Sequence, residues 1–554
     1  MMESYDYIIV GAGSAGCVLA NRLTQDGKTT VCLVEAGPID KTPMIKIPGA
    51  FAYFMFSKKY NWGFNSTVHP DIRNGEPMFS PRGKTLGGSS AVNGMVYIRG
   101  QKEDYDNWAS AGNSGWSYDD LLPYFIKSET NERGPSAYHG NTGPLHVSDG
   151  IGYYQQSHKF VEAVAETGYP LTDDFNGSQQ EGAGLYQFTI KNGERCGVAR
   201  GYLHPIMARN NLTVITNALT SRIILSDKTA QGIQYSVSGV QHTIYANKEV
   251  LISGGTFNSP QLLMLSGIGD PAHLKQHNID VIHELPGVGK NLQDHVDACV
   301  LQESLRKDGF TSSLRGLLKL LPETVKYFTK KSGKLSASIT ESGAFLKTDK
   351  NLSTPDVQMH FLPLLFDDNG RDLALMAKDG MSLHVCVLRP KSRGSVSLSS
   401  SDPTADPVID YNFFDHPEDA KTLIEGIKIS RNIMAANALS PWSGQEIHPG
   451  KDVISDQDIL DKCKERLGLV YHPVGTCKMG NDELAVVDDQ LRVHGIENLR
   501  VVDASIMPTI ISGNTNATTI VIAEKAADLL LAKANPVIEQ QAEDIEERPL
   551  TESA

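Results

Sequence analysis

The chain has 554 residues, a net charge of −14 and 7 cysteines. This length predicts two or more lobes, or one large fold with inserted segments, around a sizeable buried interior. The negative charge excludes nucleic acid as the main ligand, because phosphate binding depends on clustered Lys and Arg. The cysteines are scattered and never form a CxxC pair, which argues against a disulfide framework and a metal site and favours a reducing compartment.

The first elements predicted along the chain form a βαβ unit. Residues 5–10 are a short apolar run typical of a buried parallel strand, residues 14–25 have helical spacing, and residues 30–36 form a second strand. The first strand and the helix are joined by the turn Gly11-Ala12-Gly13-Ser14-Ala15-Gly16, and the second strand ends at Glu35-Ala36. In this context the glycines bring backbone N–H groups and the helix N-terminus against a pyrophosphate, and Glu35 accepts hydrogen bonds from a ribose. The unit predicts a dinucleotide-binding, Rossmann-type fold.

Later segments return the chain to this sheet. Residues 212–253 alternate in the manner of a β-meander. Residues 499–505 read as another core strand, and a helix follows from about residue 517 to about residue 532. The expected class is therefore α/β, with strands contributed from widely separated parts of the sequence.

The domain organisation follows from these elements. We assign residues 1–150, 206–295 and 466–534 to a discontinuous dinucleotide-binding domain. Residues 151–205 and 296–465 show strand-like alternation without a dinucleotide motif, which predicts an inserted α+β domain that caps the substrate. Residues 535–554 are acidic with few apolar residues and are interpreted as a flexible tail.

A second glycine- and serine-rich loop, PRGKTLGGSSAVNGMV, occupies residues 81–96. Its backbone donors are suited to the remainder of a long dinucleotide. The loop resembles the first signature of the glucose–methanol–choline (GMC) oxidoreductase family. The similarity continues through GTFNSPQLLMLSGIG at 255–269, LPGVGKNLQDH at 285–295, YHPVGTCKMG at 471–480 and SGNTNA at 512–517.

The resemblance implies that FAD is the cofactor, so the expected fold is a Rossmann-type FAD-binding domain with an inserted α+β capping domain. Beyond the N-terminal turn, it implies FAD contacts from Thr85, Gly88, Asn93, Gly94, Met95, Val96, Thr220, Tyr471, Asp503, Ala504 and Thr515. Some family members attach the flavin covalently through a histidine of the glycine-rich loop. Val92 stands at the corresponding position, which predicts FAD held without a covalent bond.

His472 is the predicted catalytic base. Oxidation of an alcohol requires that the hydroxyl proton be removed as hydride leaves the carbon, and a neutral imidazole with an ordinary pKa near ~6.5 suits that task. The resemblance places His472 over the flavin with a second polar residue beside it. Asn514 is interpreted as this second residue, whose amide holds the substrate oxygen without competing for the proton. The alternative for Asn514 is a residue that only stabilises its own turn.

Two further candidate residues lie at the end of the NLQDH motif and just after it. His295 is interpreted as structural, or as a support for the reaction centre, rather than as the base. Choline-using family members carry an acid just after this motif. Asp297 is therefore expected either to hold a quaternary ammonium group or to be a surface acid in a loop of the capping domain.

The N-terminus has no secretory signal pattern, and the chain contains no run of ~18 apolar residues. We therefore expect a cytoplasmic protein, at most peripheral on the inner membrane face. Residues 306–334 interleave leucines and aromatic residues with Lys and Arg. This pattern favours either a helix resting on an anionic membrane or a helix packed on its own domain, with Pro322 interrupting it.

The leading prediction is FAD-dependent oxidation of a primary alcohol to an aldehyde, in which His472 takes the proton and hydride moves to flavin N5. The motifs most resemble those of bacterial aliphatic-alcohol and choline dehydrogenases, so the electrons are expected to pass to a quinone or another acceptor. The alternatives are a choline dehydrogenase proper, an oxidase that uses oxygen, a cyanohydrin lyase that keeps FAD without net redox change, and a non-catalytic FAD-binding protein. The pair His472 and Asn514 argues against the last of these.

Overall fold

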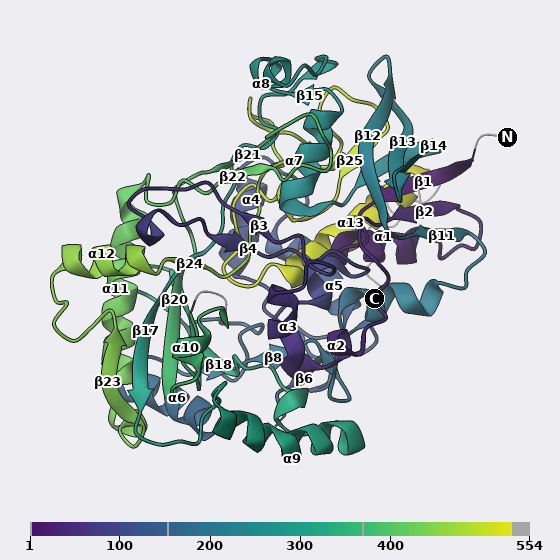
Figure 1. Ribbon diagram of the computed structural model, residues 1–554. Helices are drawn as coiled ribbons and strands as arrows, with labels where there is room; N and C mark the ends of the chain where they lie inside the picture. Colours follow the sequence, from purple (N-terminus) through teal and green to yellow (C-terminus); the bar gives the residue numbers. More distant parts are fainter. Residues whose placement is uncertain (1–2, 152–153, 368–369, 535–554) are drawn as a thin grey trace, which may run out of the picture.

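The structure is a computed structural model that describes residues 3–151, 154–367 and 370–534. The predicted acidic tail, 535–554, lies outside the described residues. Two seven-stranded sheets organise the chain, one mostly parallel and one antiparallel, and helices cover both (Figure 1). This arrangement confirms the predicted α/β class.

Strand β1 (Ser4–Val10) lies inside the first sheet, whose order is β11-β2-β1-β14-β13-β12, with β25 also paired to β14. Parallel pairs join β1 to β2 (Val31–Val34) and to β14 (Val240–Ile252), β2 to β11 (Leu212–Ile215), and β14 to β25 (Leu499–Val501). An antiparallel edge is formed by β12 (Ala218–Ser226) and β13 (Thr229–Val237). Because parallel strands need crossover connections, the sheet collects strands from distant parts of the sequence.

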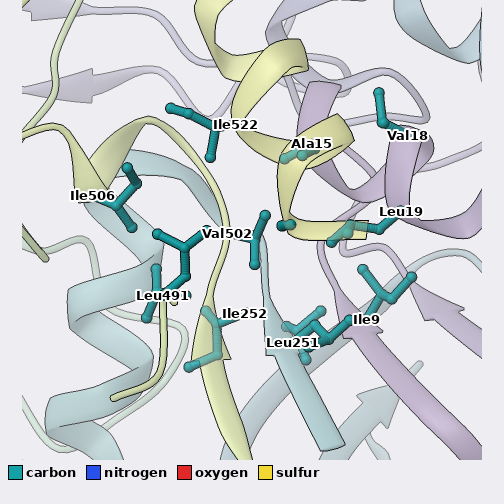
Figure 2. Packing of buried hydrophobic residues seen from close by; sticks show 14 of the residues in the cluster. Ile9, Ala15, Val18, Leu19, Leu251, Ile252, Leu491, Val502, Ile506 and Ile522 are labelled. Carbon is teal, nitrogen blue, oxygen red and sulfur yellow. The ribbon is translucent and has the colours of Figure 1, made fainter. Parts of the chain in front are cut away.

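The core of this domain forms where helices α1 (Ser14–Leu23) and α13 (Asn516–Ala534) meet the sheet. Figure 2 shows Ile9 of β1 and Leu251 of β14 near Leu19 of α1, with Ile522 of α13 above them; all four are fully buried. The close packing of α1 requires glycine at position 16, because a Cβ there would lie 1.9 Å from the Gly11 carbonyl oxygen. The N-terminus of α1 is thereby held at the carboxyl end of β1.

The second sheet has the order β23-β17-β20-β19-β18-β7, with β24 also paired to β17, and every pairing is antiparallel. Its strands are β7 (Gly182–Leu185), β17 (Val296–Ser304), β18 (Ser342–Leu346), β19 (Val357–Leu362), β20 (Gly380–Val387), β23 (Ser443–His448) and β24 (Gly468–Leu469). Helices α6 (Gln155–Glu166) and α11 (Pro417–Met434) pack on one face through apolar side chains. Alternate residues of the same strands line a cavity, because successive side chains of a strand point to opposite faces.

The remaining regular elements are short apart from α9. The helices are α2 (Pro43–Lys46), α3 (Phe51–Met55), α4 (Lys102–Ser110), α5 (Tyr118–Ser128), α7 (Gly255–Leu265), α8 (Pro271–Gln276), α9 (Leu314–Lys330), α10 (Leu373–Met376) and α12 (Asp456–Glu465). The strands are β3 (Phe64–Asn65), β4 (Phe79–Ser80), β5 (Glu129–Asn131), β6 (Leu145–Asp149), β8 (Gln187–Phe188), β9 (Ile190–Lys191), β10 (Glu194–Arg195), β15 (Ile268–Gly269), β16 (His283–Glu284), β21 (Ser395–Ser397) and β22 (Val408–Asp410). No helix of the described segments is both long enough and apolar enough to cross a bilayer.

One predicted domain boundary needs correction. Residues 466–534 were assigned to the dinucleotide-binding domain, but β24 at 468–469 pairs with β17 of the capping sheet. The return to the first domain therefore begins after Leu469. A two-residue strand carries too little periodicity to be recognised in a sequence, so this pairing is a tertiary feature.

Candidate active site

A cavity lined by both domains gathers most of the predicted site residues. From the first glycine loop and β2 it receives Gly11, Gly13, Ser14, Ala15, Glu35 and Ala36. From the second loop and the meander it receives Gly88, Asn93, Gly94, Met95, Val96 and Thr220. Its C-terminal lining includes Tyr471, His472, Asp503, Ala504, Asn514 and Thr515. Segments more than 450 residues apart in sequence, such as Gly11 and His472, thus share one wall.

Two predicted residues, Gly16 and Thr85, do not line this cavity. Gly16 lies at the contact between α1 and the Gly11 carbonyl. The fully buried hydroxyl of Thr85 donates to the Pro38 carbonyl oxygen at 2.7 Å. In this structure both residues shape the loops behind the cavity.

The lining of the first domain fits a long dinucleotide. The N-cap of α1, Gly13, provides no side-chain hydrogen bond to the first turn, so those N–H groups face the cavity without a cap. The two glycine loops touch there, since a Cβ on Gly88 would lie 2.8 Å from Gly13 Cα. The buried hydroxyl of Thr220 has no hydrogen-bond partner among the residues described. An uncapped helix start and an orphaned hydroxyl in one wall are what a phosphate- and ribose-bearing ligand requires.

Glu35 is buried at the end of β2 and its carboxylate is held by backbone. Its Oε2 accepts from Ala12 N–H at 2.9 Å and its Oε1 from Gly37 N–H at 2.8 Å. Burial raises the pKa of this carboxyl to about 7, although both hydrogen bonds act in the opposite direction. Each oxygen keeps a further lone pair toward the cavity, so a ribose hydroxyl remains compatible with these contacts.

At the far end of these loops, four side chains form a directional hydrogen-bond chain. Gln358 Nε2 lies 3.4 Å from Asn514 Oδ1, Asn514 Nδ2 lies 3.0 Å from His472 Nε2, and His472 Nδ1 lies 3.0 Å from His295 Nδ1. Because an amide nitrogen only donates, His472 Nε2 accepts and its proton resides on Nδ1. The assigned orientation of Asn514 agrees with the donor on its other side, Gln358. The unprotonated nitrogen of His472 therefore lies at the cavity.

Burial makes the imidazoles of this centre neutral. It lowers the pKa of His472 well below its ordinary value, with His295 acting in the same direction, and it lowers the pKa of His295 to about 3. One carboxylate oxygen, Asp294 Oδ1, accepts from the backbone N–H groups of both His295 and His472, each at 2.8 Å. Tyr471, just before the base, has a left-handed φ of 63°, and its carbonyl accepts from Arg82 at 2.6 Å. The position and the tautomer of His472 are thus both held by neighbours.

At the capping end of the cavity, Asp297 is buried in β17, so its interpretation as a surface loop acid is wrong. Its Oδ2 lies 2.7 Å from His384 Nδ1, while His384 Nε2 donates to the Phe366 carbonyl at 3.0 Å. Burial lowers the pKa of His384, but Asp297, Asp367 and the Phe366 carbonyl together outweigh it, and the pKa is raised. The carboxyl and the imidazole share a proton between them, so the pair has no net charge.

Sequence reasoning missed several residues at this end. His360 of β19 and His384 of β20 are direct cross-strand partners and both line the cavity, as do the ion-paired Asp367 and Arg466. A signal for the histidines exists, because each is the only basic residue of a mostly apolar strand, in VQMHFL and GMSLHVCV. No local pattern marks Asp367 or Arg466, which meet only through the tertiary fold.

A parallel sheet with glycine-rich loops at its carboxyl edge, facing a buried neutral imidazole, defines a dinucleotide-dependent oxidoreductase. The chain belongs to the GMC oxidoreductase family, whose N-terminal model matches residues 5–297 and whose C-terminal model matches residues 390–523. It is therefore an oxidoreductase that uses FAD and acts on CH–OH donors.

Relatives and solved structures agree with this assignment. The chain is 46% identical to alcohol dehydrogenase [acceptor] of Pseudomonas putida, over 96% of both chains. It is 42% identical to the mitochondrial choline dehydrogenase of Homo sapiens, over 97% of this chain and 91% of that one. Its fold matches formate oxidase of Aspergillus oryzae, a protein described in connection with FAD modification, with a TM-score of 0.87, 27% identity, and coverage of 96% of this chain and 98% of that one.

Substitutions of Gly13 and Gly16 in the first loop are expected to have different effects, one on flavin binding and the other on the stability of the fold. Gly16→Ala places a methyl group 1.9 Å from a backbone oxygen and should destabilise the apoprotein by roughly 1–3 kcal/mol. Gly13→Ala, whose nearest atom lies 4.0 Å away, should unfold like the parent but retain less flavin. Thermal unfolding of apoprotein and flavin content after purification measure the two effects. Full flavin content in Gly13→Ala would contradict a close approach of the cofactor at this turn.

The buried position of His472 predicts an acid-shifted pH profile. The neutral imidazole is the form that accepts a proton, and its lowered pKa keeps it neutral below the ordinary value near ~6.5. We expect kcat/KM for an alcohol to stay flat from about pH 8 to about pH 6.5 and to fall only at more acidic pH. The exposed His242 provides a control, since His242→Gln should give the same profile. A fall centred at or above ~6.5 would show that the base is not held in a buried site.

Proposed function

We propose that this enzyme oxidises a neutral primary alcohol to an aldehyde, with His472 as the base. The observation that carries the proposal is the 3.0 Å contact between Asn514 Nδ2 and His472 Nε2 at the cavity. A bound hydroxyl replaces this contact with two: Asn514 donates to the alcohol oxygen, and the alcohol O–H donates to Nε2. The hydroxyl proton passes to His472, and FAD, when bound, supplies the acceptor for the hydride that leaves the alcohol carbon.

We propose that the cavity-lining loop residues hold FAD without a covalent bond. The turn Gly11 to Ala15 receives the pyrophosphate, Glu35 and Ala36 the adenosine ribose, and Thr220 a further polar atom. The second loop from Gly88 to Val96, with Tyr471, Asp503, Ala504 and Thr515, encloses the rest. Val92 lines the same cavity and its side chain has no nucleophile for attachment to the flavin, which supports non-covalent binding.

The charge balance of the capping end favours a neutral substrate. Asp297 shares its proton with His384, and Asp367 pairs with Arg466, so the carboxylates are compensated. Apolar side chains of Ile339, Leu362, Phe366 and Leu469 line the space beside them. A lipophilic alcohol fits this lining better than an ammonium ion, which needs an uncompensated anion or an open aromatic face.

Choline is the second candidate, and one observation favours it. Asp297 Oδ1 is buried, lines the cavity, and has no hydrogen-bond partner in the described part of the chain. If a cation binds, it does so at this oxygen, where the attraction is strong because the site is dry.

For the electrons, we propose an acceptor such as a quinone, because the Pseudomonas relative is named as a dehydrogenase with an acceptor that its name leaves unspecified. A lipid-soluble quinone agrees with a cytoplasmic enzyme that is peripheral on the inner membrane face. Oxygen remains the alternative acceptor.

Removal of the base tests the role of His472. His472→Ala should slow the anaerobic bleaching of the flavin by saturating alcohol about 10²-fold or more, the scale of lost base catalysis. His360→Asn, which changes another buried histidine of the same cavity, is the matched control and should cost much less. Flavin content confirms that both variants are folded. An unchanged rate in His472→Ala refutes its role as the base.

A substrate comparison separates the two candidate functions. Medium-chain primary alcohols should bleach the flavin, and choline should not, because Asp297 is neutralised by His384. Asp297→Asn should leave alcohol turnover within about threefold, since a neutral amide replaces a neutral pair. If choline bleaches the flavin, alcohols do not, and Asp297→Asn abolishes the choline reaction, then the second candidate is correct.

A further inference from the structure

Helix α9 has the usual amphipathic arrangement reversed. Figure 1 shows it along the bottom edge of the molecule, outside both sheets. Its inward side is narrow and includes the buried Gly316 and Tyr327, whose hydroxyl donates to the Lys46 carbonyl at 3.3 Å. A surface helix ordinarily turns its apolar stripe to the core. In α9 the apolar stripe points to solvent.

The outward stripe is apolar throughout. At 100° per residue, its members fall within an arc of about 100° on the helix. Their exposed fractions run from 52% to 75%, and they are Leu314, Leu317, Leu318, Leu321, Val325 and Phe328. An exposed apolar patch of this kind marks an interaction site rather than ordinary surface.

A basic row borders this stripe on one side. The helical positions of Arg315, Lys319, Lys326 and Lys330 follow one another next to the apolar arc. The surrounding segment 306–334 holds eight Lys or Arg against two acids, a local charge of +6, in a chain whose net charge is −14. The positive charge of this face therefore favours binding of an anionic partner.

We propose that α9 docks the enzyme on an anionic lipid bilayer, with the leucine stripe in the acyl boundary and the basic row at the headgroups. Lipid satisfies both features at once, since apolar side chains enter the interface and Lys and Arg meet anionic lipid. A second copy of this chain satisfies only the apolar stripe, because it brings a like charge of +6 against the same face.

The docked face is connected to the cavity. Directly after α9, Leu335 packs against Gly49, with its Cδ2 3.1 Å from where a Cβ on that glycine would lie, and Ser338 and Ile339 then line the cavity. Beside Gly49, α3 places Phe51 and Met55 in the cavity lining. Two exposed aromatic residues accompany it, Tyr53 within this short helix and Phe56 directly after it. Docking through α9 thus brings this wall of the cavity to the bilayer. An apolar alcohol and a quinone can then enter the cavity from the lipid. This entry route rests on the proposed function, whereas the docking does not.

Vesicle binding by the holoenzyme tests the docking. Wild-type protein should sediment with phosphatidylcholine vesicles that contain about 30% phosphatidylglycerol and far less with pure phosphatidylcholine, and about 0.5 M salt should weaken it. Leu317→Glu/Leu321→Glu should reduce the bound fraction by about tenfold or more. Ile454→Glu, at a 77% exposed apolar residue near α12, is the matched control and should bind like the parent.

The other outcomes contradict the proposal. Equal sedimentation of wild type and the α9 double variant, or no sedimentation of either, overturns lipid docking. If the wild type forms a concentration-dependent oligomer, the double variant is monomeric and neither binds vesicles, the apolar stripe is an interface with a second copy of the chain instead. Vesicle sedimentation is independent of turnover, so inactivity toward every alcohol with intact binding overturns the proposed function alone. If anionic vesicles stimulate the oxidation of long-chain but not of short-chain alcohols, the lipid route is supported. If the rates with and without vesicles are equal for both, the lipid route is refuted.

Discussion

The carboxylate of Asp294 lies at the junction of the two domains, and its Oδ1 accepts backbone N–H groups from both His295 and His472. His295 directly precedes β17 of the capping sheet, and His472 lies at the start of the C-terminal return to the FAD-binding domain. A buried carboxylate oxygen satisfies two donors that have no regular secondary structure to pair with. Burial raises the pKa of Asp294 to about 7, and the nearby Arg82 opposes this rise. The base is thus positioned by main-chain contacts, independently of its own side chain.

Around this junction the cavity is nearly free of net charge. His295, His360 and His472 have lowered pKa values because they are buried, and the carboxylates at the capping end are paired. In such a dry site a single proton transfer to His472 has a large electrostatic effect, because little water screens it. The neutral surroundings therefore serve two purposes: they keep the base unprotonated before reaction, and they favour a neutral substrate.

At the surface, helix α9 also departs from the usual distribution of polar and apolar side chains. Inside the cavity, buried ionisable side chains are paired, as Asp297 with His384 and Asp367 with Arg466, whereas the apolar stripe of α9 is exposed to solvent. Both departures from ordinary patterning lie along one path, from the exposed stripe through Leu335 and Ser338 to the cavity. For an enzyme of lipophilic substrates, this path links the place where the substrate dissolves to the place where it reacts.

The sequence alone was sufficient to predict the dinucleotide fold and the α/β class, because the glycine turn at 11–16 and the acid at 35 act within one contiguous βαβ unit. FAD as the cofactor followed from the family resemblance of the later motifs, such as residues 81–96. The sequence also predicted His472 and Asn514 through short motifs, and the structure places these two side chains in contact. Only the tertiary structure decided that Asp297 is buried and neutralised by His384, since these residues meet through the pairing of β17 and β20. The orientation of α9 also depends on the tertiary structure. Its periodicity predicts an amphipathic helix, but the face that points outward is decided by the contacts that Gly316 and Tyr327 make in the fold. Local patterns act through neighbours in the chain, whereas burial and charge pairing depend on residues that only folding brings together.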